Sequence, residues 1–331
     1  MTPQSNLKSS ISAIVACYND AQAIPIMTDR LIKVFEKSNI LDYEIIFVDN
    51  SSTDNSEEVI REISQNNNKV IGVNHSHNFQ QTSQGSFKNG MEVATKDACV
   101  LLDGDLQDPP ELIEQFIDKW RDGYDVVYGI RYNRDASLVF RLGAKLFYRL
   151  FDWMSSIHIP RDASDFSLID KRVVYWILKC KEKDLFIRGL RAYVGFKQDG
   201  IKYFRPERMF GKSSNNFFKN IMWAKKGIFS FSRLPLDAIT TLGFILTVIS
   251  FLLIIVEVLV RFFAPEFTPR GLTTVVLLIV FFGSFNILAV SIVGEYIAKI
   301  FEEVKGRPIF IRKNIIKDGV VLPYPYDNND K

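Results

Sequence analysis

The chain of 331 residues holds 41 lysine and arginine residues against 38 aspartate and glutamate residues, a formal net charge of +3. A charge so close to neutral argues against a nucleic-acid-binding protein, and the length allows one large domain or two smaller ones. The three cysteines (Cys17, Cys99 and Cys180) lie far apart without a CxxC pair, which favours buried thiols in a reducing compartment. The polar start of the chain, MTPQSNLKSS, does not resemble a secretory signal peptide.

The N-terminal part of the chain alternates β-branched apolar runs with segments of helical periodicity. The expected strands are 11–16, 44–48, 69–73, 98–102 and 125–130, and the expected helices are 22–37, 56–66, 80–95 and 110–121. This order predicts an α/β fold with a mainly parallel sheet covered by helices on both faces. Ligands bind such sheets beyond the carboxyl ends of the strands. No GxGxxG or P-loop motif follows any of these runs, so phosphates would need another positive partner.

Three carboxylates follow the fourth expected strand in the stretch VLLDGDLQDPP. A calcium loop is not favoured, because the position that needs glycine is Asp108 and two prolines stiffen the loop. Asp108 is instead expected to cap the helix that starts at these prolines. Asp103 and Asp105 are alternate residues of an extended stretch and point to the same side, so they predict a Mg²⁺ or Mn²⁺ site that also takes substrate phosphates.

An HxH pair follows the third expected strand. His75 and His77 could indicate a metal site, but no third acidic ligand lies nearby in the sequence. The pattern therefore favours a polar loop after that strand.

Two long apolar segments occupy the C-terminal third. Residues 236–263 and 271–298 each exceed the roughly 20 apolar residues that cross a bilayer, and the short linker APEFTPR makes them a helical hairpin. Lysine and arginine gather outside the hairpin rather than in its linker, which predicts that the N-terminal domain and the tail lie in the cytoplasm. The expected location is the inner or plasma membrane, as a multi-pass protein.

Two further stretches combine basic and apolar side chains. Residues 137–154, SLVFRLGAKLFYRLFDWM, and residues 215–236, NNFFKNIMWAKKGIFSFSRLPL, are expected to lie at the membrane surface, the alternative being helices packed on the domain. The tail from Lys305, KGRPIFIRKNII, is basic and strand-like, and it is expected to pack on a domain or on a neighbouring subunit of a homo-oligomer. The domain division is therefore 1–212, 213–234, 235–299 and 300–331.

Four stretches of the chain resemble family 2 glycosyltransferases with a GT-A fold in order and spacing: IVACYNDAQAI, YEIIFVDNSSTDNS, NFQQTSQGSFKNGM and VLLDGDLQDPPEL. Two later stretches, DFSLIDKRVV and RPERMFGKSS, followed by the two apolar segments, resemble the polyprenyl-phosphate glycosyltransferase branch. That branch includes dolichol-phosphate mannose synthases and bactoprenol glucosyltransferases. The resemblance spans about residues 10–310 and implies a Rossmann-like GT-A catalytic domain with a transmembrane hairpin.

The resemblance implies a donor site at the strand ends. Asp49 would contact the base or ribose of the nucleotide, and Asp54 is the later acid of the same motif, although Asp54-x-x-Glu57 is also a capping box. This chain has VDNSSTD where the family usually shows VDDGSxD, so Asn50 and Ser51 are departures. The remaining expected donor and metal residues are Tyr18, Asn19, Asp103 on the nucleotide side, and Asp105 with Gln107 on the metal.

The resemblance also implies the reacting groups. Asp165 matches the carboxylate usually proposed as general base, the alternative being a turn or strand-edge acid. Arg208 is expected in the catalytic set, and the basic positions facing the phosphates are Arg131, Arg134, Arg205, Arg208 and Lys212. Because the second pKa of a phosphate monoester is about 6, a lipid phosphate needs a strong base less than a hydroxyl does.

The expected reaction is metal-dependent, inverting transfer of a hexose from a nucleotide sugar to polyprenyl phosphate at the cytoplasmic membrane face. UDP-glucose is the donor by resemblance to bacterial two-span members, with GDP-mannose, UDP-GlcNAc or an aminosugar nucleotide as alternatives. A processive polysaccharide synthase is disfavoured, because the chain lacks QxxRW and two spans cannot enclose a pore. A catalytically silent nucleotide-sugar-binding scaffold is the alternative from another class.

Overall fold

The structure is a computed structural model that describes residues 9–79, 82–132, 163–183, 185–206, 234–263 and 272–325. The chain forms two compact units. The first comprises Met1–Tyr148, Ile157–Phe217 and Arg307–Lys331, and the second comprises Arg149–Ser156 and Phe218–Gly306. The expected surface helices within 137–154 and 215–233 lie outside the described residues.

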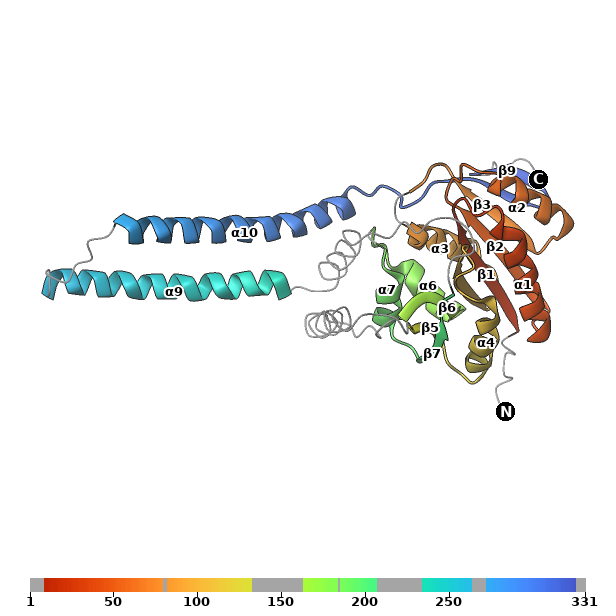
Figure 1. The fold of residues 1–331 in the computed structure, drawn as a ribbon, viewed down its shortest axis with the longest axis horizontal. Coiled ribbons are helices and arrows are strands. Elements are labelled where there is room, and N and C mark those ends of the chain that lie inside the picture. The colour runs from red at the N-terminus through yellow and green to blue at the C-terminus, as the bar shows by residue number, and fades with distance from the viewer. Residues whose placement is uncertain are drawn as a thin grey trace. The chain divides into compact units, whose positions relative to one another are not determined.

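The first unit is built on one sheet (Figure 1). Its strands are β1 (Ser10–Cys17), β2 (Asp42–Asp49), β3 (Val70–His75), β4 (Ala98–Asp103), β5 (Val126–Tyr132), β6 (Ala163–Asp170), β7 (Gln198–Phe204), β8 (Arg312–Lys317) and β9 (Val320–Pro323). They lie in the order β7-β5-β6-β4-β1-β2-β3-β8-β9. The neighbours β3-β2-β1-β4 are parallel, as are β5 and β7, whereas β6 and β8 are antiparallel to the strands beside them.

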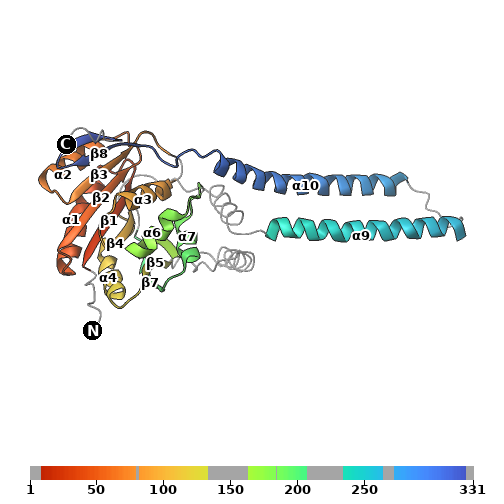
Figure 2. The same cartoon turned by 180° about the vertical axis from the view of Figure 1, so that it is seen from behind.

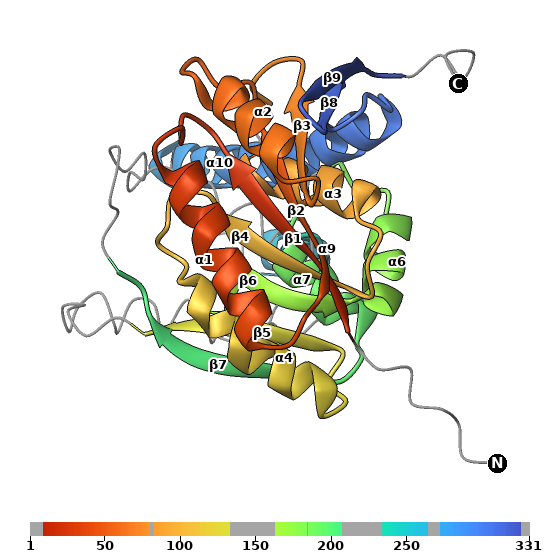
Figure 3. The same cartoon turned by 90° about the vertical axis from the view of Figure 1, so that its right-hand side faces the viewer.

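Helices cover both faces of this sheet (Figure 3). They are α1 (Ala23–Lys37), α2 (Ser56–Asn66), α3 (Thr82–Val93), a 3₁₀ turn (Pro110–Leu112) that leads into α4 (Ile113–Arg121), α6 (Lys171–Lys179) and α7 (Ile187–Val194). Side chains alternate across a strand, so Val15 faces a core with residues of α1, α2 and α4, while Ile14 faces a second core with residues of α3, α6 and α7. Both faces of β1 are therefore buried.

The five strands and four helices expected in the N-terminal part are present within a few residues of their predicted bounds. The expectation of a mainly parallel sheet is correct only for its central strands, and the whole sheet is mixed. Two strands cause the difference. β6 inserts antiparallel between β4 and β5, and β8 returns from the C-terminal segment to pair antiparallel with β3.

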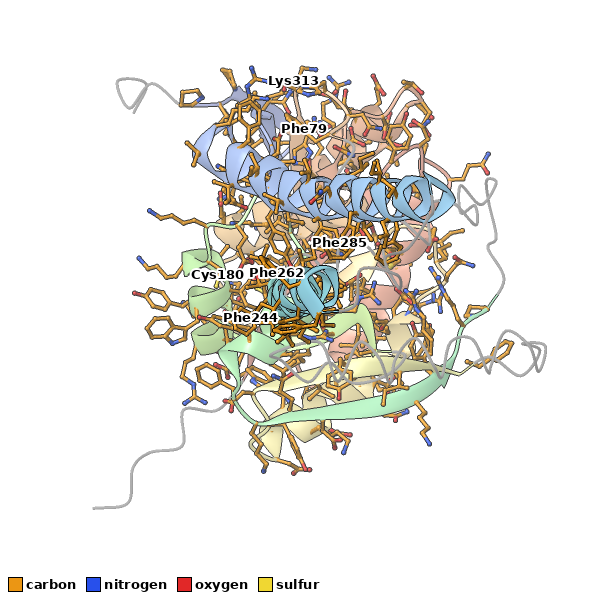
Figure 4. The ribbon with its side chains drawn as sticks, turned by 90° about the vertical axis from the view of Figure 1, so that its left-hand side faces the viewer. Phe79, Cys180, Phe244, Phe262, Phe285 and Lys313 are labelled. Carbon is orange, nitrogen blue, oxygen red and sulfur yellow. The ribbon has the colours of Figure 1, made fainter. Side chains whose placement is uncertain are left out.

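The second unit contains two long helices, α9 (Leu234–Phe263) and α10 (Leu272–Val304), which run antiparallel (Figures 1 and 2). Both expose large apolar side chains, among them Phe244 and Phe262 of α9, labelled in Figure 4. The two apolar segments are thus helices, as expected. Within the described residues, one stretch, Phe281–Val304 of α10, has the length and apolar composition to cross a membrane.

The tail that was expected to be strand-like forms β8 and β9 at one edge of the sheet. β8 pairs with β3 in a register that places Asn314 opposite Asn74, and the side chain of Ile316 is fully buried. The segment after α10 is therefore part of the first unit rather than a free tail.

Candidate donor and metal site

The register of the central strands brings their carboxyl ends to one edge. Asp49 of β2 lies opposite Cys17 of β1 and opposite Asn74 of β3, and Asp103 of β4 lies opposite Ala16 of β1. The polar residues that follow these strands therefore share one edge of the sheet, which is where an α/β sheet places its ligand.

The loops after β1 and β2 brace each other. The backbone N–H of Asn19 donates to Ser52 Oγ at 2.9 Å, and Asn19 Oδ1 accepts from the N–H of Thr53 at 2.8 Å. Asn19 itself has a φ of 56°, a conformation that asparagine tolerates better than most residues. Asp54 adds a third link, because its Oδ2 accepts from the N–H of Ala21 at 3.2 Å.

The reciprocal capping box of Asp54 and Glu57, one of the two interpretations of Asp54, does not form. The residue before α2 is Asn55, which makes no side-chain cap, and Asp54 Oδ1 accepts instead from the N–H of Ser56 at 3.1 Å. The other expected member, Glu57, lies 3.6 Å from the Lys313 ammonium group. Asp54 therefore accepts from the first N–H of α2 and also from Ala21 in the loop after β1, whereas Glu57 contacts β8 instead of the start of its own helix.

Asp49 anchors the second loop. Its carboxylate, only 2% exposed, accepts from both the N–H and the hydroxyl of Ser52. Burial raises the pKa of Asp49, and these two hydrogen bonds act against that rise. The intervening Ser51 has a φ of 59°, which explains why the family usually has glycine there. Tyr18 lies exposed at the neighbouring loop.

The turn after β4 packs closely against β1 at the glycine between its two acids. The N–H of Gly104 donates to the Ala16 carbonyl at 2.8 Å, and an added Cβ would lie 3.0 Å from that oxygen and 3.1 Å from Asp20 Oδ2. Asp105 follows with 9% exposure; its Oδ1 accepts from the N–H of Gln107 at 3.1 Å, and its Oδ2 lies 3.8 Å from Arg205 Nη2. Close packing of this turn on β1 therefore fixes both carboxylates.

Asp103 lies among other carboxylates. Burial raises its pKa to about 7, and repulsion from Asp108, Asp105 and Asp165 adds to the rise, whereas Arg131 acts in the opposite direction. Among the described residues, an ionised Asp103 is therefore poorly compensated by neighbouring cations. A divalent cation at this place would relieve the repulsion.

Asp108 does not cap the following helix, as the sequence pattern had indicated. The 3₁₀ turn and α4 begin without a side-chain cap, and Asp108 Oδ1 accepts from the Tyr203 hydroxyl at 2.5 Å and lies 3.8 Å from Arg131 Nη2. Its other oxygen, Oδ2, is buried and has no hydrogen-bond partner in the described part of the structure. Partners on β5 and β7 thus outweigh the local cap, and burial raises the pKa of this carboxyl.

These residues fit a divalent cation that takes part of its ligands from a substrate. Within the described residues, no group of three carboxylate, imidazole or thiolate side chains could hold a metal alone. Mg²⁺ commonly takes only one or two protein carboxylates and completes its shell with water and phosphates, and Asp103 and Asp105 can supply these. The Gln107 amide N–H donates to the Pro206 carbonyl at 3.2 Å, which ties this turn to the end of β7.

Asp165 of β6 joins the same cluster. Asp165 is 9% exposed. Because β6 runs antiparallel to β4 and Ser167 pairs with Leu101, continuing this register brings Asp165 beside Asp103. Its Oδ1 accepts from Arg188 Nε of α7 at 3.2 Å, and Arg188 Nη1 donates to the Ala163 carbonyl at 3.1 Å. Asp165 lies within a buried strand and not in a turn.

Two arginines of α7 were not among the expected site residues. Arg188 contacts Asp165 directly, and Arg191 is buried, stacks on the Tyr128 ring at 4.8 Å and donates to the Ser164 carbonyl at 3.2 Å. Their spacing of three residues places both on one face of the helix. Two arginines at this spacing in FIRGLR, within an otherwise apolar helix, are the sequence feature that could have indicated their role.

The expected phosphate-binding cations are only partly described. Arg131 lies at the end of β5, where its Nε donates to the Tyr203 hydroxyl at 3.3 Å, and Arg205 follows β7 beside Asp105. Because β5 and β7 are parallel neighbours, the two guanidinium groups belong to the same edge of the sheet. Arg134, Arg208 and Lys212 lie outside the described residues.

The HxH pair provides no metal site. His75 ends β3, and its two ring nitrogens are both engaged, Nδ1 with Asn50 Oδ1 and Nε2 with the Asn89 amide. His77 lies exposed in the loop that follows.

The sequence is similar to those of known glycosyltransferases. The profile described as Glycosyl transferase family 2 matches residues 12–177. The uncharacterized glycosyltransferase YkcC of Bacillus subtilis (strain 168) is 36% identical over 301 residues, 91% of this chain and 92% of that protein. The SfII prophage-derived bactoprenol glucosyl transferase of Shigella flexneri is 33% identical over 307 residues, 92% of this chain and 97% of that protein. The crystal structure of mannosyl-3-phosphoglycerate synthase from Rubrobacter xylanophilus gives a TM-score of 0.45 at 15% identity, covering 69% of this chain and 75% of that one.

The chain therefore belongs to glycosyl transferase family 2, and its first unit is a GT-A-like α/β domain with a mixed sheet. The protein is a glycosyltransferase.

Proposed function

We propose that the protein transfers a hexose, with inversion, from UDP-glucose to polyprenyl phosphate in a metal-dependent reaction at the cytoplasmic membrane face. The observation that carries the proposal is the cluster of Asp103, Asp105 and Asp165 at the strand ends, beside the guanidinium groups of Arg131 and Arg205. Acids that favour a cation and arginines that favour phosphate then share one edge of the sheet. A relative covering nearly the whole chain is named a bactoprenol glucosyl transferase, which supports the lipid acceptor.

The donor would be held by the braced loops and the carboxylate turn. Asp49, with Tyr18, Asn19 and Asp54 from the loops after β1 and β2, would bind the nucleoside. Asp105, with Asp103 and Gln107, would hold Mg²⁺ or Mn²⁺, which when bound neutralises charge on the donor diphosphate. The buried position of Asp105 fixes its carboxylate before the donor arrives, so little ordering is needed on binding.

The acceptor phosphate would be drawn in by cations. Arg131 and Arg205, with Arg134, Arg208 and Lys212 from the undescribed segments, are the groups proposed to receive it. One phosphate oxygen forms the new bond to the anomeric carbon while the bond from that carbon to the nucleoside diphosphate breaks, which inverts the configuration. Since the acceptor is mostly dianionic at neutral pH, Asp165 is needed more to orient the acceptor than to remove a proton.

The membrane is the proposed source of the acceptor. The exposed apolar side chains of α9 and α10 support a two-helix hairpin that spans the bilayer, although among the described residues only Phe281–Val304 meets the length and composition criteria on its own. Under the positive-inside rule, Arg233 before α9 and Arg307 and Arg312 after α10 support a hairpin with both ends on the cytoplasmic side.

The test is to incubate membranes containing the full-length protein with polyprenyl phosphate, Mg²⁺ and single nucleotide sugars. The panel is UDP-glucose, GDP-mannose, UDP-GlcNAc and an aminosugar nucleotide, and mass spectrometry identifies the lipid product. We expect a polyprenyl-monophosphate hexose with UDP-glucose. A lipid product formed only with another donor would replace UDP-glucose as the assigned donor. Donor binding without any lipid product would support the silent-scaffold alternative.

A further inference from the structure

A chain of buried polar side chains crosses the first unit from the donor loops to the C-terminal strand. At its centre is His75, 2% exposed at the end of β3. Its Nδ1 lies 3.0 Å from Asn50 Oδ1, and its Nε2 lies 2.8 Å from the Asn89 amide nitrogen. The amide nitrogen can only donate, so Nε2 accepts and the proton of a neutral imidazole lies on Nδ1. The two asparagines thus fix both the tautomer and the ring.

One end of this chain lies in the donor loops. Asn50 directly follows Asp49, and its amide nitrogen donates to Asn78 Oδ1 at 3.1 Å and to the Phe79 carbonyl at 3.4 Å. Its Oδ1 also accepts from the N–H of Phe79 at 3.2 Å. A carboxylate could not donate to these two oxygens, which accounts for asparagine where the family usually has aspartate. Asn50 therefore joins the loop after β2 to the loop after β3.

The other end lies on the C-terminal strand. Arg312, the first residue of β8, donates to Asn89 Oδ1 through Nε at 2.9 Å and through Nη2 at 2.5 Å. Phe310, two residues earlier, stacks on the His75 ring with centroids 5.6 Å apart and planes at 4°. Arg312 thus contacts Asn89 directly, and the segment carrying it also contacts His75.

Breaking this chain would leave polar groups buried without partners. Asn89 is fully buried and Asn50 nearly so, and an unpaired buried donor or acceptor loses the full free energy of its hydration. Burial, with Arg312 nearby, lowers the pKa of His75 to about 4, so the imidazole stays neutral and keeps this pattern of donors and acceptors. The loops beside Asp49 are consequently tied to β8 by one continuous set of hydrogen bonds.

We propose that Arg312 is a positioning residue for the nucleotide-sugar donor, acting through Asn89, His75 and Asn50 to hold the loops that bind the nucleoside. The C-terminal strand is then part of the donor site, although it comes after α10 in the sequence. The identity of the donor in this inference rests on the proposed function.

The test compares full-length Arg312→Met and wild type in detergent, by calorimetric binding of UDP with Mg²⁺ and by steady-state transfer from UDP-glucose. Removing the two hydrogen bonds to Asn89 is expected to weaken UDP binding and raise the donor KM by about five- to thirty-fold, while kcat changes less than twofold. Arg312→Lys, which keeps a cationic hydrogen-bond donor on a single nitrogen, is expected to recover part of the loss. Lys317→Met removes an exposed cation from the same strand and is expected to leave both constants unchanged.

Ile316→Ala tests whether Arg312→Met acts only by destabilising the fold. This variant removes a fully buried side chain from β8 and leaves the hydrogen-bonded residues unchanged. It is expected to lower the melting temperature at least as much as Arg312→Met and yet leave UDP affinity within twofold of wild type. If both variants weaken UDP equally, or if Arg312→Met binds UDP as wild type does, the inference is overturned. Failure of wild type to bind UDP at all would instead overturn the donor assignment in the proposed function, and the same comparison would then use the nucleotide that does bind.

Discussion

Arg188 Nε lies 3.2 Å from Asp165 Oδ1, so the carboxylate expected to act as the base is already paired with a cation from α7. The same guanidinium also donates to the Ala163 carbonyl and so holds the start of β6. A carboxylate held in this way is fixed in orientation, because the guanidinium group that binds it is itself held by the Ala163 carbonyl. The pair is better suited to positioning the acceptor phosphate than to removing a proton.

Arg188→Ala is expected to lower kcat/KM for polyprenyl phosphate by about ten- to hundred-fold, because a hydrogen bond to a charged group is lost beside the reacting atoms. Arg188→Lys should retain more activity, since it keeps the charge. Steady-state assays with varied acceptor measure both. Arg121→Ala, which removes an exposed arginine that donates to the Ser38 carbonyl, is the control and should act as wild type. Equal kcat/KM for Arg188→Ala and wild type would rule out this role.

Asp165→Asn is expected to reduce kcat by less than the roughly 10²- to 10⁴-fold that loss of a true general base costs. The amide oxygen can still accept from Arg188, and the acceptor is already dianionic above its second pKa of about 6. The measurement is kcat for both proteins from about pH 5.5 to about pH 8.5, a range that includes the second pKa of the acceptor phosphate. A loss far above a thousandfold, with disappearance of an acidic limb present in wild type, would show that Asp165 removes a proton.

Gly104→Ala is expected to lower turnover at least about tenfold with little loss of stability, because the new Cβ would meet the Ala16 carbonyl at 3.0 Å and displace the carboxylate turn. The matched change is Gly85→Ala in α3, where the Cβ would lie 3.8 Å from Ile309 in ordinary contact. Transfer rates and melting temperatures of the two variants provide the comparison. Similar activity in both would mean that the turn tolerates displacement.

The pH dependence of stability should reflect His75. Its pKa is about 4 in the folded protein and near 6.5 when unfolded, so the unfolded state binds more protons between these values and stability falls as the pH drops from 6.5 to 4. The loss from this group is on the order of 3 kcal/mol at most. The charged or titratable groups facing it are Arg312 of β8 and His77 of its own loop.

His75→Asn removes the titrating ring and keeps an N–H donor near Asn50. The difference in melting temperature between about pH 7.5 and about pH 5, which lie on either side of the ordinary histidine pKa, should be smaller than in wild type. His77→Asn, at the exposed member of the pair, should retain the wild-type difference. An unchanged difference in His75→Asn would remove His75 as the source.

The alternation of apolar runs and amphipathic helices was sufficient to predict the central sheet and the edge where its ligand binds. Because β1, β2 and β4 are buried on both faces, their sequences are rich in apolar residues, and the acids that end β2 and β4, Asp49 and Asp103, interrupt that pattern. The two long apolar helices were equally clear from composition.

The errors come from contacts between residues far apart in the sequence. The sequence around Asp108 matched a helix cap, but its carboxylate accepts a hydrogen bond from the hydroxyl of Tyr203, 95 residues later. Arg188 matched no motif, because its role depends on the position of β6 beside α7. The role of β8 likewise could not be read locally, since its partner β3 precedes it by more than two hundred residues of chain.

The central claim is that Asp105 holds a divalent cation for transfer from UDP-glucose to polyprenyl phosphate. The most direct measurement is the amount of polyprenyl-monophosphate hexose formed by wild type and Asp105→Ala, each after chelation and again after addition of Mg²⁺. The account predicts that wild type loses activity on chelation and regains it with Mg²⁺, whereas Asp105→Ala forms no product under either condition while retaining the wild-type melting temperature. Product formation by Asp105→Ala at near the wild-type rate, or undiminished wild-type activity after chelation, would contradict it.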